Sequence, residues 1–177
     1  MSSSCVNHCM RAVFVGVIAL AVAAAANGGA ESLRPAHFAA RPGWHVGNNR
    51  VHNCVGVPRS QCAQVESWAA TIRFRDCGNC LPHKTLAALP PTGISIQLIL
   101  GWERKRLREP AFSWPPRIRT RDVVGPIEGG PHNVGSVQKS GRIRGFSAYL
   151  WVFFGRRHPS AAQVARANAE LGSATLP

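Results

Sequence analysis

Four cysteines in the middle of the chain have a spacing that suits disulfide, redox or zinc chemistry. They follow the pattern C-x7-C-x14-C-x2-C, and an even number of cysteines in an exported chain favours disulfides. The last pair has the spacing of redox-active thiols, but the βαβ pattern that usually surrounds a redox site is missing. Only this one spacing fits a zinc knuckle, and export disfavours zinc. The four residues are Cys54, Cys62, Cys77 and Cys80.

The length of the strand expected at 65–75 helps to choose among the three possible disulfide pairings. An extended strand of this length separates its ends by about 30 Å, whereas a disulfide requires Cα atoms within about 7 Å of each other. A cysteine before the strand then cannot reach one after it, unless the strand bends near Ala69. We therefore expect the disulfides Cys54–Cys62 and Cys77–Cys80.

Arginine dominates the charge of the chain. The 177 residues carry 21 Lys+Arg against 8 Asp+Glu, a formal net charge of +13, and the only lysines are Lys84, Lys105 and Lys139. Guanidinium groups suit a surface that binds anions. A GC-rich genome also enriches arginine without any functional reason, so both causes remain open.

Several arginines recur at alternate positions in segments expected to be strands. Alternate residues of a strand share a face, so neighbouring strands of this kind would form an arginine ladder on the outer face of a sheet. Trp102 and Trp114 border a charged segment at 103–109 and can stack on a ligand. The ladder would contain Arg73, Arg75, Arg117, Arg119, Arg121 and, with a bulge at Gly145, Arg142 and Arg144.

No motif for catalysis, cofactor binding or metal binding is present. The chain lacks G-x-S-x-G, a Walker loop, a dinucleotide fingerprint and H-E-x-x-H. Acidic residues are too few for paired carboxylates to be expected. We expect no catalytic residue, metal or cofactor and no specific nucleic-acid motif. The enzymatic alternative is thiol–disulfide exchange at Cys77 and Cys80.

Residues 1–30 have the layout of a cleavable signal peptide. Arg11 precedes the apolar stretch 12–26, which small residues follow. Cleavage after Ala26 or Ala30 fits this layout, Met10 is an alternative start, and an uncleaved anchor is the competing interpretation. No second membrane segment follows. The sequence therefore predicts a secreted or envelope-associated protein.

Alternating hydrophobicity predicts an α+β fold with a small antiparallel sheet of about five strands. The domain is expected at 50–172, after an irregular arm at 31–49 and before a tail at 173–177. The run 146–154 is apolar on both faces and is expected to be the central strand. A hairpin turn is expected at Ser140-Gly141. The other strands are expected at 50–57, 65–75, 94–102, 117–124 and 133–138.

One helix is expected, at 161–171, packed on the sheet. Ser160 and Gln163 form a capping box at its start. Gly172 marks its end. Val164, Ala167 and Leu171 share an apolar stripe along it.

These features predict an exported, non-enzymatic domain that binds an anionic partner through arginine. The expected partners are an anionic envelope polymer, lipid headgroups or an acidic protein. The oligomeric state does not follow from the sequence.

Overall fold

The computed structural model describes residues 33–50, 62–74, 82–103 and 109–177. The expected signal peptide and most of the strand expected at 50–57 fall outside these ranges. Residues 33–177 belong to one compact unit.

Five antiparallel strands form a single sheet in the order β1-β2-β3-β5-β4. This confirms the predicted five-stranded antiparallel sheet. The middle strand, however, is β3. The run 146–154 is β5, an inner strand between β3 and β4, because its hairpin partner β4 occupies the edge beside it. The strands are β1 (His45–Arg50), β2 (Cys62–Ala70), β3 (Ile94–Glu103), β4 (Gly135–Ile143) and β5 (Phe146–Phe154).

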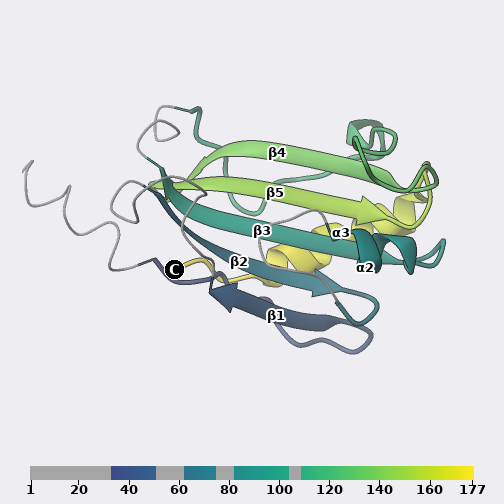
Figure 1. Ribbon diagram of the computed structural model, residues 1–177, viewed down its shortest axis with the longest axis horizontal. Helices are drawn as coiled ribbons and strands as arrows, with labels where there is room; N and C mark the ends of the chain where they lie inside the picture. The colour runs from purple at the N-terminus through teal and green to yellow at the C-terminus, as the bar shows by residue number, and fades with distance from the viewer. Residues whose placement is uncertain (1–32, 51–61, 75–81, 104–108) are drawn as a thin grey trace, which may run out of the picture. The chain divides into compact units, whose positions relative to one another are not determined.

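The helix α3 (Ala161–Ser173) covers one face of the sheet, which we call the helix face (Figure 1). Val164, Ala167 and Leu171 of α3 are buried there, as the sequence predicts. The Ser160 hydroxyl accepts a hydrogen bond from the Gln163 N–H at 3.2 Å, which confirms the capping box.

Alternate side chains of β3 and β5 fill the helix face in matched pairs. Ile96 lies opposite Val152 and Leu98 lies opposite Leu150, and all four side chains are 0% exposed. Period-two alternation places these branched side chains together on one side. The hydrocarbon core of the protein therefore lies between β3, β5 and α3.

The hairpin between β4 and β5 turns at Arg144-Gly145, not at Ser140-Gly141 as expected. Both turn residues have positive φ, 48° and 86°, as a two-residue turn matching the twist of the strands requires. This turn places Ile143 opposite Phe146, so Ile143 reaches the helix face without the bulge that the sequence suggested.

The segment expected to be a strand at 117–124 does not join the sheet. Ile118 is buried. Its N–H donates to the side-chain oxygen of Asn168 in α3, and the Asn168 amide donates to the Ile118 carbonyl, both at 2.8 Å. Residues Thr120–Asp122 form the 3-10 turn η2, and only Val124 makes a bridge to a strand, at Ser136. The segment lies against α3 because that helix satisfies its backbone.

The other face of the sheet, which we call the polar face, carries the short helix α2 (His83–Ala87). Leu86 and Leu89 pack there against Phe153 of β5. The strand expected at 65–75 ends at Ala70. The Thr71 N–H still donates to the Ile94 carbonyl at 2.9 Å, and the chain then leaves the sheet. Over the described ranges, none of the helices has the length and apolar character needed to cross a membrane.

Candidate functional site

The exposed charged groups of the described residues are almost all basic. Among the acids whose side chains are described, only Glu128 is exposed; Glu66 and Glu170 are buried, and Glu109 and Asp122 are half-buried. With acids withdrawn from the surface, the positive potential of the arginines is little offset. The exposed basic residues are Arg34, Arg41, Arg73, Lys84, Arg117, Arg119, Arg121, Arg144, Arg156, Arg157 and Arg166.

Residues 117–121, which we call the arginine segment, present three of these arginines together. Arg117, Arg119 and Arg121 are exposed, while Ile118 between the first two is 2% exposed and belongs to the core. Arg119 has an extended backbone, with φ −118° and ψ 155°. The Arg119 N–H also donates to the Asp122 carboxylate at 2.8 Å. The segment is thus held at Ile118 and Arg119, and its three arginine side chains are exposed.

The single arginine ladder expected from the sequence is not formed. Its largest set, the arginine segment, lies beside α3, whereas Arg73 follows β2 on the polar face. There Phe74 stacks on Trp68, with ring centroids 4.6 Å apart and an interplanar angle of 12°. Arg142 lies in β4 and donates to the Glu109 carbonyl at 2.7 Å. The ladder fails because the segment at 117–124 packs on the helix instead of pairing with a strand.

The remaining predicted site residues are placed only in part. Trp114 is half-buried against the core, and its indole N–H donates to the Ala174 carbonyl at 3.2 Å. Trp102 belongs to β3, and Cys62 begins β2; the side chains of both fall outside the described part. Also outside it are Arg75, Cys54, Cys77 and Cys80. The two disulfides and the redox alternative therefore stay predictions.

A buried carboxylate on the polar face is a feature that the sequence interpretation missed. Glu66 of β2 is 0% exposed. It accepts hydrogen bonds from the side-chain amides of Gln97 in β3 and Asn49 in β1, the latter at 3.3 Å. Strand alternation places Gln97 on the face of β3 away from the apolar core, but gives no sign that it is buried. This layer of carboxylate and amides is specific to the polar face.

Tryptophan and glutamine alternate in one row across the polar face. Trp68 lies opposite Gln97, which lies opposite Trp151, which lies opposite Gln138. At the outer end of the row, Trp68 covers Gly47, where a Cβ atom would lie 2.5 Å from the indole ring. Gly47 is therefore needed for the close approach of the Trp68 ring, which no local sequence pattern predicts.

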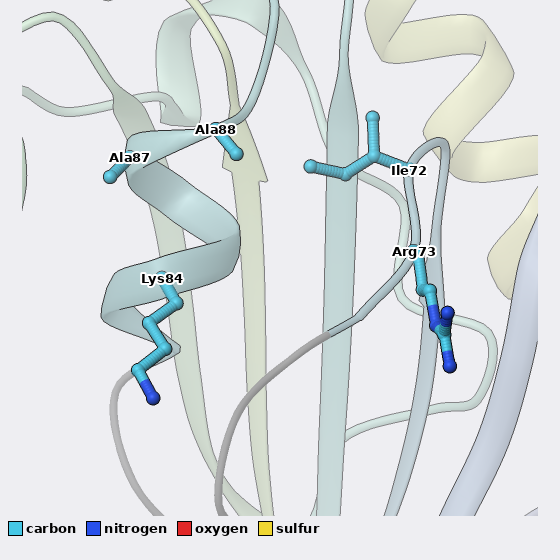
Figure 2. Close-up of a pocket in the computed structure, with 5 residues that line it drawn as sticks. All are labelled: Ile72, Arg73, Lys84, Ala87 and Ala88. Carbon is cyan, nitrogen blue, oxygen red and sulfur yellow. The ribbon is translucent and has the colours of Figure 1, made fainter.

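An open pocket of about 640 Å³ lies at the edge of the polar face, between α2 and residues 71–74 (Figure 2). Arg73 and Lys84 supply its charged groups. Its apolar lining comes from Ile72, Ala87 and Ala88.

A second buried carboxylate, Glu170, belongs to α3. It is 1% exposed, and its oxygens have no hydrogen-bond partner in the described part of the chain. The Ser173 hydroxyl donates to the main-chain carbonyl of Glu170 at 2.7 Å. Burial raises the pKa of Glu170, although the nearby guanidinium groups of Arg41 and Arg166 act to lower it.

In the ranges that the structure describes, no three His, Cys, Asp or Glu side chains gather into a possible metal site. Comparison with protein-family models, with curated proteins and with solved structures found no match to this chain. The case for a function therefore depends on the geometry alone.

Proposed function

We propose that this protein is an exported, non-enzymatic binding domain whose arginine segment docks onto an anionic component of the cell envelope or an anionic partner. The observation that carries the proposal is the placement of Arg117, Arg119 and Arg121 on one segment anchored by Ile118. Export is proposed from the signal-peptide pattern of residues 1–30.

Anchoring favours binding because it reduces the entropy lost when the site engages a partner. The Ile118 backbone makes both of its hydrogen bonds to Asn168, so residues 117–119 are positioned before any anion arrives. Guanidinium groups form bidentate, charge-assisted hydrogen bonds to carboxylate, phosphate and sulfate.

The test compares two triple substitutions of equal charge. Arg117→Gln, Arg119→Gln and Arg121→Gln remove the charges of the arginine segment. Arg34→Gln, Arg41→Gln and Arg144→Gln form the control, since all three are exposed arginines on other segments. The probes are polyglutamate, dextran sulfate and vesicles containing phosphatidylglycerol, which separate carboxylate, sulfate and lipid phosphate.

We expect the first triple to weaken binding to the preferred probe by at least about tenfold in low salt, and the control to weaken it by less than about threefold. Wild-type binding should also weaken steeply between roughly 50 and 500 mM salt, because exposed charges are screened. Equal losses in the two triples would show that net charge, not the arginine segment, attracts the probe. An affinity for the probe that does not change with salt concentration would contradict an electrostatic binding site.

A further inference from the structure

The pocket at the edge of the polar face is apolar at one end and cationic at the other. In Figure 2, the side chains of Ile72 and Ala88 point into the gap between α2 and residues 71–74. The Lys84 side chain extends from α2 on one side of the gap and the Arg73 side chain from the other side, both away from the end where Ile72 and Ala88 face each other. A molecule that filled the pocket would therefore have hydrocarbon at one end and a positive charge on each wall at the other.

Packed residues hold both walls of the pocket. On the α2 side, Leu86 and Leu89 are buried against Phe153 of the sheet. Ile72, on the opposite wall, packs against the same cluster. On the other side, the stack of Phe74 on Trp68 fixes the backbone next to Arg73. The pocket volume, about 640 Å³, lies within the range of roughly 300–1,000 Å³ that is usual for small-molecule sites.

We propose that this pocket binds a small anionic amphiphile, a molecule with one anionic head and a short hydrocarbon chain. The head pairs with Arg73, with Lys84 as a second cation on the opposite wall. Lys84 also interacts within the protein, so Arg73 is the principal ligand of the head. The chain lies against Ile72, Ala87 and Ala88, where removing it from water stabilises the complex. The site lies on the polar face, away from the arginine segment, and does not depend on the function proposed for that segment.

Four ligands separate the contributions of head and chain. Octanoate and octyl phosphate carry both parts and differ in head group, octanol carries only the chain, and acetate carries only the head. Isothermal titration calorimetry, supported by ligand-observed NMR, measures each affinity. We expect octanoate, octyl phosphate or both to bind at least about tenfold more tightly than octanol and acetate. The ligand that binds more tightly shows whether the pocket prefers a carboxylate or a phosphate head group.

Substitutions then locate the binding. Arg73→Gln with Lys84→Gln should weaken the preferred ligand by about tenfold or more, and Ala88→Trp should block it by filling the apolar end. Arg117→Gln with Arg119→Gln is the matched control; it removes equal charge from the arginine segment and should leave this binding unchanged. All five positions are exposed, so folding should persist, and circular dichroism checks this.

Three results would overturn the pocket proposal. They are the failure of both octanoate and octyl phosphate to bind, octanol binding as tightly as either, and undiminished binding after the pocket substitutions. The polyanion experiments on the arginine segment are independent, because pocket substitutions spare that segment. Failure of one proposal therefore leaves the other standing.

Discussion

The two faces of the sheet bury different chemistry on the same strands. In β3, Ile96 and Leu98 face α3 and lie opposite Val152 and Leu150 of β5, while Ser95 and Gln97 face the other way and are equally buried. On the helix face the side chains need only shape and volume to pack. On the polar face each buried amide or carboxylate also needs a hydrogen-bond partner.

This difference separates the apolar core from the buried polar network and the pocket. The helix face forms a continuous apolar cluster that joins the sheet, α3 and Ile118. The polar face holds the Glu66 network, the tryptophan–glutamine row and, at its edge, the pocket between α2 and residues 71–74. Polar residues fixed on strands are well suited to orient a ligand, so a small-molecule ligand is sought on this face, whereas the arginine segment proposed to bind a polyanion lies beside α3.

The largest expected effect comes from truncating neighbouring residues of β3 that face opposite ways. Leu98→Ala should lower the free energy of unfolding by about 3–5 kcal/mol, because it leaves a cavity in the apolar cluster. Ile99→Ala should cost less, about 2 kcal/mol, since Ile99 lies between Glu66 and Tyr149 and belongs to neither apolar cluster. Urea unfolding measures both. Equal costs would mean that the two faces are packed alike.

A medium effect is expected at Glu66. Glu66→Ala leaves the amide donors of Gln97 and Asn49 without this acceptor, which should cost about 1–3 kcal/mol. Glu66→Gln keeps one acceptor oxygen and replaces the other by an NH2 group, so it can keep one of the two hydrogen bonds and should cost less than Glu66→Ala. If the two substitutions destabilise equally in urea, retaining one acceptor oxygen does not stabilise the fold.

The smallest effect is expected at Glu170 and depends on pH. Its folded-state pKa lies above its usual value of 4.5, so the folded protein holds a proton that the unfolded chain releases first. Stability should therefore fall as pH rises from 4.5 through the raised pKa of the folded state. Glu170→Gln should remove this decline. Urea unfolding of both proteins at several pH values tests it, and an unchanged slope in the variant would assign the decline to other groups.

Features that depend on neighbouring residues in the chain could be predicted. The α3 cap needs only Ser160 and Gln163, three residues apart, and the prediction is confirmed. The strands at 94–102 and 146–154 were also predictable, because β-branched and aromatic side chains in long apolar runs favour strands wherever they pair. These elements carry their own signal.

Features that depend on a partner far away in the chain could not be predicted from the sequence. The strand β1 reads H-V-G-N-N-R, with no strand signal of its own, and forms because β2 offers an edge. The arginine segment alternates like a strand, yet Asn168 and the core position of Ile118 hold it against α3. The turn at Arg144 places a non-glycine residue at positive φ, which local propensity argues against.

By itself, the sequence determined the α+β class, the capped helix, the two apolar strands and the strongly basic charge. These follow from periodicity and composition, which act through neighbouring residues. Only the tertiary structure decided that the arginines divide between two sides of the sheet and that Arg73 and Lys84 line opposite walls of one pocket. It also decided that Glu66 is buried among amides. Such pairings join residues far apart in the chain, and their energies depend on burial and cross-strand register, which exist only once the sheet has formed.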